Sequence, residues 1–213
     1  MHELAGFAER DGTVILFLAY TGLRWGEMAA LRVMDLDMLR RRVNVDQAVT
    51  EVGRELVYGT PKNHSRRSVP FPTFLAEPLA ELCVGKGPKH FVFTAPMGGA
   101  LRNRNWRART FDPALKQLLD EYPSLDPLTP HDLRHTAASL AISAGANVKA
   151  VQKMLGHASA AMTLLVYADL FDDDLDAVGE ALSRNGNPTL FNQTRHVPRS
   201  PGSPGALAWE EPR

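Results

Sequence analysis

The 213-residue chain contains a single cysteine and carries no net charge, because 24 Lys and Arg balance 24 Asp and Glu. One cysteine cannot form an internal disulfide, which excludes a small secreted scaffold held together by disulfides. No apolar run approaches the ~18 residues that a membrane-spanning helix needs, and no signal-peptide pattern opens the chain. Length and composition therefore favour one or two globular domains in a reducing, cytoplasmic compartment, with no role for a membrane.

The lack of net charge argues by itself against a polyanionic partner, but the charges are unevenly distributed. Residues 1–168 hold 20 basic and 16 acidic residues, whereas residues 169–213 hold 4 and 8. Residues 62–116 alone contain 10 basic and 3 acidic residues. A solvated surface would explain any one basic cluster, but several clusters together favour a surface that binds nucleic acid. The candidate DNA-binding residues are Arg40, Arg41, Arg42, Arg66, Arg67, Arg102, Arg104, Arg107 and Arg109.

Hydrophobic periodicity predicts an α+β fold that is mainly α-helical, with a small three-stranded antiparallel sheet. The sheet is expected from three short segments with strand character, at 42–46, 55–58 and 67–69. Asn147 and Ser159 are expected to cap the starts of two helices, and Gly156 to end the first of them. The expected helices span residues 3–19 (with a break at 11–12), 25–33, 74–82, 103–120, 130–144, 148–155, 160–168 and 172–183. Residues 184–213, rich in Pro, Gly and Asn, are expected to form a disordered tail.

The segment from Thr129 to His135, Thr-Pro-His-Asp-Leu-Arg-His, has the pattern of a helix start. Thr129 suits the N-cap, proline suits the first helical position, and the carboxylate of Asp132 can reach back to the cap. His131 and Arg134 then lie one turn apart near the positive end of the helix dipole, which favours an anion site. A plain surface helix with solvated His and Arg side chains is the alternative.

Four further residues stand out, although each has an ordinary structural explanation. Arg24 lies between glycines that let the backbone approach a ligand, but it can equally pair with Glu27 three residues later. Lys62 lies in a turn-rich segment, where lysines usually aid solubility, and His157 follows the end of a helix. Tyr167 follows Leu-Leu-Val, a context more typical of a core residue than of a nucleophile.

Five short motifs occur in a fixed order along the chain: Thr-Gly-Leu-Arg-Trp-Gly-Glu, Thr-Pro-Lys-Asn, His-Asp-Leu-Arg-His-Thr, Leu-Gly-His and Val-Tyr-Ala-Asp. In this order the chain resembles the catalytic domain of the tyrosine recombinases of the phage integrase family over residues 1–183. The resemblance implies site-specific DNA strand cleavage and religation through a 3′-phosphotyrosyl intermediate, without cofactor or metal. It also implies that the catalytic residues are Arg24, Lys62, His131, Arg134, His157 and Tyr167.

The resemblance implies a role for each of these residues. Arg24 and Arg134 would stabilise the charge on the phosphate oxygens, since arginine stays protonated and can bind two oxygens at once. His131 would assist deprotonation of Tyr167, and His157 would hold the phosphate. The surrounding cations would favour the tyrosine phenolate.

Lys62 would protonate the leaving 5′-hydroxyl. Glu27 and His135 would support the pocket rather than touch phosphate.

Other readings of the same residues remain open. His131 and His135 have the spacing of zinc ligands, but no third ligand is evident. Residues 148–167 also fit a helix-turn-helix regulator. Within the resemblance, a catalytically idle DNA-binding prophage remnant and a type IB topoisomerase-like relaxing activity are the alternatives.

The resemblance extends to partners and location. It implies double-stranded DNA with attachment sites as substrate, self-association on DNA into a tetramer, an accessory bending or directionality factor, and a nucleoid-associated cytoplasmic protein. The N-terminal core-binding and arm-binding domains of such proteins are not found in this sequence. The segment after Tyr167 is expected to dock either on its own chain or on a neighbour.

Without those N-terminal domains, the chain is expected to bind DNA weakly and to lose it readily as salt rises, because binding releases counterions from the phosphates. Fluorescence anisotropy with a labelled duplex between about 50 and 200 mM salt measures this, with an expected loss of affinity of at least about tenfold. An affinity that is insensitive to salt would contradict a phosphate-binding surface.

Overall fold

The structure, a computed structural model, describes residues 1–53, 55–60, 66–170, 179–180 and 182–183. Contacts divide the chain into two units, Met1–Phe171 and Asp172–Arg213. The helices of the first unit are α1 (His2–Phe7), α2 (Gly12–Thr21), α3 (Trp25–Ala29), α4 (Ala76–Cys83), α5 (Asn103–Trp106), α6 (Asp112–Glu121), α7 (Asp132–Ser143), α8 (Val148–Leu155) and α9 (Ala160–Tyr167). Its strands are β1 (Leu36–Asp37), β2 (Arg42–Val45), β3 (Ala48–Val52), β4 (Glu55–Gly59) and β5 (Arg67–Pro70). Short 3₁₀ segments lie at Glu9–Asp11, Val33–Asp35, Thr73–Leu75 and Ala168–Leu170, and a π-helical turn at Arg107–Phe111.

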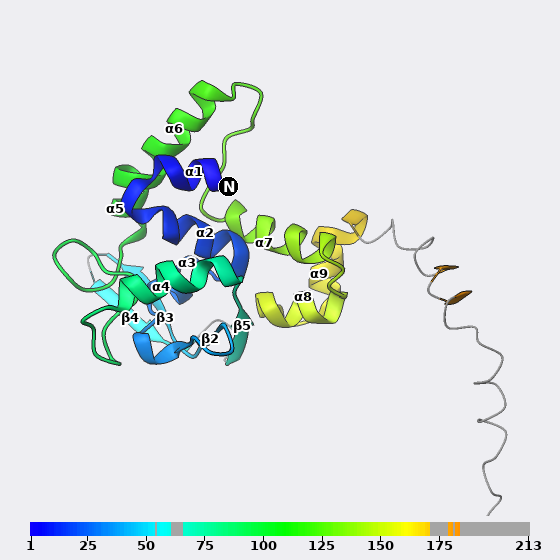
Figure 1. Cartoon of the computed structure of the whole chain (residues 1–213), viewed down its shortest axis with the longest axis horizontal. Coiled ribbons are helices and arrows are strands. Elements are labelled where there is room, and N and C mark those ends of the chain that lie inside the picture. The colour runs from blue at the N-terminus through cyan, green and yellow to red at the C-terminus, as the bar shows by residue number, and fades with distance from the viewer. Residues whose placement is uncertain (54, 61–65, 171–178, 181, 184–213) are drawn as a thin grey trace, which may run out of the picture. The chain divides into compact units, whose positions relative to one another are not determined.

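Helix α2 is the centre of the core. Its sequence is apolar on almost every face, and Ile15, Phe17 and Leu18 are buried. It packs against α1 on one side and α7 on the other, so that these helices form a layer beside the strands (Figure 1). Leu133 of α7 and Val69 of β5 belong to the same buried cluster. Burial of this one helix therefore joins α1 to α7, which is distant from it in sequence.

The strands form two antiparallel sheets rather than one. The three-stranded sheet has the order β1-β2-β5, with Val43 opposite Val69, while β3 and β4 form a separate two-stranded sheet. The predicted number of strands and their antiparallel pairing are confirmed for the main sheet, but its predicted composition is wrong. The segment predicted as its second strand is β4, which pairs with β3, and the place in the main sheet is taken by the two-residue β1.

Local signals predicted the helices more closely than the strands. Helix α8 has the predicted bounds, and Asn147 accepts a hydrogen bond from the Ala150 N–H at 2.9 Å, as an N-cap does. Ser159 likewise accepts from the Met162 N–H, at 3.3 Å, at the start of α9. The helix predicted at 25–33 is shorter, and the one at 103–120 is interrupted by the π-helical turn.

The helix predicted from residue 130 begins at Asp132 instead. The predicted reach of the Asp132 carboxylate to the cap is nevertheless present, since it accepts from the Thr129 N–H and hydroxyl, both at 2.7 Å. The helix predicted at 172–183 and the tail at 184–213 fall almost entirely outside the described residues. None of the helices in the described residues is long and apolar enough to cross a membrane.

Gly26 brings α3 against the backbone of β3. A Cβ atom at this position would lie 2.3 Å from the Val49 carbonyl oxygen, so only glycine fits without displacement of backbone. The glycine was expected to allow approach of a ligand, but the group that approaches is the protein's own backbone. This contact fixes the first turn of α3, which carries Glu27.

We expect Gly26→Ala to lower the free energy of unfolding by about 1–3 kcal/mol, because the added methyl group must displace α3 or β3. Gly6→Ala is the matched control. A Cβ there meets nothing within 4 Å, and alanine in a helix is about 0.5–1 kcal/mol more favourable than glycine. Urea unfolding of both variants measures the difference, and equal stabilities would contradict the tight contact.

Candidate active site

The buried carboxylate of Glu27 organises one group of charged residues. Its side chain is only 1% exposed. One oxygen accepts the Arg24 backbone N–H at 2.8 Å, and the other bonds the Arg24 guanidinium at 3.1 Å. The predicted Arg24–Glu27 pair is therefore present, and it fixes Arg24 at the start of α3.

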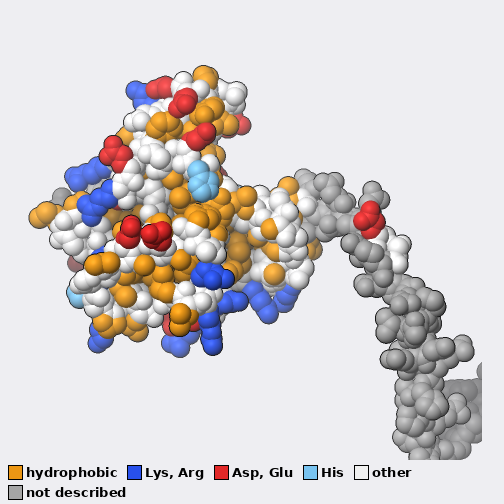
Figure 2. Space-filling model, in the orientation of Figure 1, with side chains coloured by type: hydrophobic (Ala, Val, Ile, Leu, Met, Phe, Trp, Pro, Cys, Tyr) orange, Lys and Arg blue, Asp and Glu red, His pale blue; other side chains and the backbone are white. Residues whose placement is uncertain are grey.

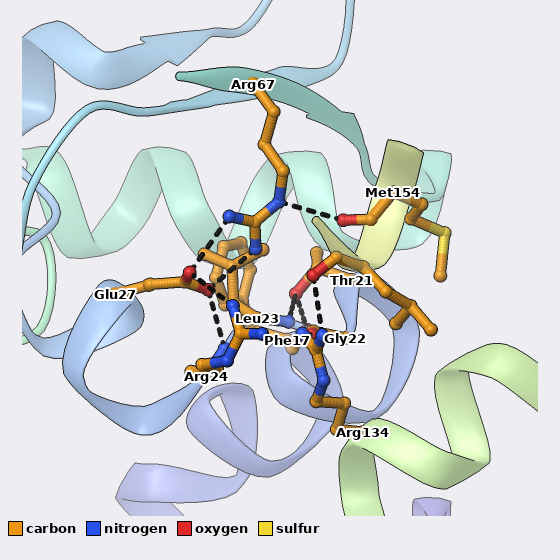
Figure 3. A network of polar contacts seen from close by, with 10 residues as sticks. Phe17, Thr21, Gly22, Leu23, Arg24, Glu27, Arg67, Arg134 and Met154 are labelled. Atoms are coloured by element: carbon orange, nitrogen blue, oxygen red, sulfur yellow. Dashed lines mark hydrogen bonds and ion pairs between the residues drawn. The ribbon is translucent and has the colours of Figure 1, made fainter. Parts of the chain in front are cut away.

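Arg67 from β5 binds the same carboxylate from the other side (Figure 3). Its two terminal nitrogens donate to the two oxygens of Glu27 at 2.9 and 2.6 Å, and its Nε donates to the Met154 carbonyl of α8 at 3.0 Å. The Arg67 side chain is 8% exposed. The structure therefore corrects its place among the DNA-binding candidates: Arg67 links β5, α3 and α8 inside the protein and does not belong to an exposed surface.

The two arginines keep Glu27 ionised. Burial alone raises the pKa of this carboxyl, but the hydrogen bonds and charges of Arg67 and Arg24 outweigh it, so that the pKa lies below its ordinary value of 4.5. A carboxylate that accepts several charge-assisted hydrogen bonds is a rigid anchor. Glu27 therefore fixes the orientation of both guanidinium groups.

Arg134 of α7 joins two further segments. Its side chain is buried, and it donates to the Gly22 carbonyl at the end of α2 and to the Leu155 carbonyl at the end of α8, the latter at 2.6 Å. Gly22 has φ of +65°, and a Cβ there would lie 2.7 Å from a Leu155 methyl group. Burial, followed by the charge of Arg24, lowers the pKa of Arg134 to about 10, which leaves it protonated at neutral pH.

Three of the predicted catalytic residues, Arg24, His131 and Arg134, line one pocket of about 350 Å³. Asn103, which no sequence motif singled out, and Arg107, which was predicted as a DNA-binding residue but not as a catalytic one, also line it. Burial, followed by the neighbouring His135, lowers the pKa of His131 below its ordinary value. The pocket thus offers three guanidinium groups, of Arg24, Arg107 and Arg134, and a neutral imidazole, a combination suited to an anion with several oxygens.

His157 follows Gly156, which ends α8 in a left-handed conformation with φ of +66°. Its Nδ1 lies 3.0 Å from the Thr163 hydroxyl of α9, which orients the ring. Burial, followed by the positive charges of the nearby arginines, lowers the pKa of His157 to about 4. The ring is therefore neutral at pH 7, so it can donate a hydrogen bond but does not add a positive charge.

Tyr167 lies at the end of α9 and is 6% exposed. It packs in a small cluster with residues of α7 and α8, as the alternative reading of a core tyrosine predicts. Burial raises its pKa above 10.0, and the opposing charge of Arg134 is the smaller effect. The charge of Arg134 does favour the phenolate, as expected, but burial outweighs it, so the phenol stays protonated at neutral pH.

Among the described residues, His135 is the side chain found in hydrogen-bond contact with the Tyr167 hydroxyl, and its Nδ1 lies 2.8 Å from it. His131, which the resemblance assigned to deprotonation of the tyrosine, contacts His135 instead, with ring centroids 5.2 Å apart in an edge-on arrangement. His135 was expected to support the pocket from behind. The structure places it directly against the tyrosine.

The remaining candidates are surface residues or lie outside the described residues. Arg40, Arg41, Arg42, Arg66, Arg104 and Arg109 are exposed, whereas Arg102 and Arg107 are half-buried. Arg107 pairs with Asp112 at 3.3 Å. Exposed Lys and Arg side chains form several separate groups on the face in Figure 2, not one continuous patch. Lys62 lies outside the described residues.

A mainly helical domain that gathers arginines and histidines around a pocket, with a tyrosine beside them, has the parts of a tyrosine recombinase catalytic domain. Comparison with known proteins agrees. Residues 1–173 match the phage integrase family, and the chain belongs to that family.

Two curated relatives show the extent of the similarity. The chain is 32% identical over 208 residues to the transposase of transposon Tn916 from Enterococcus faecalis, covering 85% of this chain and 49% of that protein. It is 30% identical over 175 residues to the integrase of Mycobacterium phage L5, covering 78% and 45%. The chain therefore spans about half the length of the curated relatives that it matches.

A solved structure shares the fold. The Tn1549 transposon integrase (residues 82–397), determined in complex with circular intermediate DNA, superposes with a TM-score of 0.71 at 23% identity. The match covers 84% of this chain and 64% of that one.

We expect Glu27→Gln to lower the free energy of unfolding at pH 7 by about 3–5 kcal/mol, because it leaves the buried Arg67 without its counter-charge. The pKa of Glu27 is lowered in the folded state, so its contribution to stability is complete above the ordinary value of 4.5 and is lost as pH falls through the lower folded value. Urea unfolding at several pH values should therefore show the two proteins converging in acid.

Asp112→Asn is the matched control for this prediction, since it removes a carboxylate paired with an arginine at the surface. Its effect should stay below about 1 kcal/mol. Equal losses for the buried and the exposed pair would show that Glu27 does not anchor the two guanidinium groups.

Proposed function

We propose that this chain cleaves and religates DNA as the catalytic domain of a site-specific recombinase, through a 3′-phosphotyrosyl intermediate at Tyr167. The observation that carries the proposal is the convergence of Arg24, His131 and Arg134 on one pocket, with Arg134 near enough to Tyr167 for its charge to act on the phenol. A phosphodiester in that pocket gains negative charge on its non-bridging oxygens in the transition state. Two fixed guanidinium groups stabilise that charge more than they stabilise the ground state.

The proposed reaction conserves the phosphate bond. The Tyr167 oxygen forms a bond to phosphorus as the bond from phosphorus to the 5′-oxygen breaks, and the 5′-oxygen takes up a proton. Lys62 remains the proposed donor of that proton. His157, neutral and oriented by Thr163, would donate one hydrogen bond to the phosphate. Religation reverses these steps, so that neither ATP nor another energy source is consumed.

The proposed substrate is duplex DNA, in line with the solved relative bound to circular intermediate DNA. The exposed arginines at the start of β2 and in the turn before it, Arg40 to Arg42, are proposed contacts to the DNA backbone. The exposed Arg66, Arg104 and Arg109 are the others. A tetramer on DNA, an accessory factor and a nucleoid location remain predictions from the resemblance.

Covalent capture tests this proposal. The chain is incubated with a library of nicked duplexes of random sequence. In each duplex the nick lets the cleaved end dissociate, so that religation fails and the covalent adduct remains. The adducts are then recovered under denaturing conditions and sequenced. We expect the wild type to form adducts and Tyr167→Phe to form none. Removal of the Arg134 guanidinium in Arg134→Ala should slow adduct formation by about 10²–10³-fold.

Tyr122→Phe is the matched control, because it removes a phenol hydroxyl that bonds Glu3, at 2.9 Å. It should form adducts at the wild-type rate. A wild type that binds DNA without forming an adduct would refute the catalytic proposal in favour of an idle DNA-binding remnant. Supercoil relaxation without recombinant product would favour the topoisomerase-like alternative.

A further inference from the structure

The proposed nucleophile is held in a state that is poorly reactive. Tyr167 is buried, and its phenol is neutral at pH 7. A neutral phenol attacks a phosphodiester slowly, so the reaction needs a group that takes the proton as the new bond forms. That group must lie within hydrogen-bond reach of the phenol oxygen, at about 2.6–3.2 Å.

Among the described residues, the hydrogen bond found for the Tyr167 hydroxyl is the one to His135 Nδ1, at 2.8 Å. A phenol donates to an imidazole nitrogen only if that nitrogen carries a lone pair, so the ring then holds its own proton on Nε2. The aromatic rings are 5.8 Å apart between centroids, and both side chains come from packed helices, α7 and α9. The contact is therefore built by the fold and not by a loop.

We propose that His135 is the proton acceptor for Tyr167, a role that rests on the proposed function. As Tyr167 attacks, its O–H bond breaks, the proton moves to His135 Nδ1, and the phenol oxygen's electron pair forms the bond to phosphorus. The bond from phosphorus to the 5′-oxygen breaks at the same time, and the 5′-oxygen takes a proton from the proposed donor Lys62. In religation, His135 returns the proton to the leaving phenol oxygen.

The surroundings of His135 fit a transient positive charge. Its ring faces the edge of the His131 ring, which has a lowered pKa and is neutral at pH 7, so the proton on His135 meets no second charged imidazole there. Negative charge is also close, because the charge of Asp132 on the first turn of α7 interacts with His135. Among the residues that the structure describes, the ionisable groups that interact with His135 are His131, Asp132, His157 and Tyr167, and Arg134 is next to it in the chain.

The variant that isolates proton transfer is His135→Asn. Its side-chain oxygen replaces Nδ1 and can still accept the phenol hydrogen bond, but an amide takes up no proton near neutral pH. We expect adduct formation by His135→Asn to be slower by about 10²–10⁴-fold, with binding of the nicked duplex unchanged. Thermal unfolding shows whether the variant is folded.

A second substrate separates the base from the acid. Sulfur in place of the bridging 5′-oxygen leaves without protonation, so it should restore most of the activity of Lys62→Ala. It should restore none of the loss in His135→Asn, because the phenol must still lose its proton. Restoration of His135→Asn by sulfur would place His135 at the leaving group and overturn the proposal.

The matched control is a second histidine–tyrosine contact, between His2 Nε2 and the Tyr20 hydroxyl at 3.0 Å. This contact is exposed and lies far from Tyr167 in the sequence. His2→Gln replaces that nitrogen with an amide and should leave the rate of adduct formation unchanged. Equal rates for the wild type, His2→Gln and His135→Asn would overturn the proposal.

A measurement without DNA tests the pair itself. In protein labelled at the tyrosine Cζ carbon, the Tyr167 signal (assigned by its loss in Tyr167→Phe) should shift with pH as His135 protonates, because the imidazolium becomes the donor to the phenol oxygen. The shift should vanish in His135→Asn. A Tyr167 signal that does not follow His135 overturns the proposal.

The two proposals fail in different ways. If the wild type forms no adduct but the Tyr167 signal shifts as His135 protonates, the proposed function fails, and the histidine–tyrosine pair is a structural contact only. If the wild type forms adducts and His135→Asn matches it, the function stands and the role of His135 falls.

Discussion

The buried carboxylate of Glu27 is the constraint on which the site depends. It lies on a short helix, α3, and binds arginines from its own helix start and from β5. A charge with 1% exposure is tolerable only because both oxygens are fully engaged with cations. Through Arg67 the same carboxylate reaches the last turn of α8, where Arg134 also binds. The sheet, α3, α7 and α8 thus meet at one ionic junction.

The electrostatic character of the site follows from this junction. Burial, together with the charges of several arginines, lowers the pKa of the nearby His157 to about 4, and burial also raises the pKa of Tyr167. Cations close to a buried phenol do not by themselves ionise it, because loss of solvent disfavours the phenolate more strongly. The arrangement therefore provides fixed positive charge for the proposed phosphate substrate, but it requires a local base for Tyr167, the proposed nucleophile. His135 is in hydrogen-bond contact with Tyr167.

Helices and their caps were largely predictable, because their signals lie within a few residues of one another. Asn147, Gly156 and Ser159 mark their helix ends in sequence and in structure. The pairing of the strands was not predictable, because it depends on segments that are distant in sequence. Strand β2 pairs with β5 across a long intervening segment, and the two-residue β1 is too short to show a periodicity. The role of Arg67 did have a signal. It is two residues from the buried Val69 in β5, on the same face of the strand.

The sequence by itself determined the family, the helical class and the order of arginines, histidines and tyrosine that the proposed chemistry requires. Tertiary structure decided what surrounds each of them. Two arginines that look alike in sequence, Arg66 and Arg67, have side chains 82% and 8% exposed, because only the second lies on the inner face of its strand. His131 and His135 differ by one helical turn, yet one lines the pocket and the other bonds the tyrosine. The contacts that each side chain makes with segments distant in sequence, which no local pattern encodes, make that distinction.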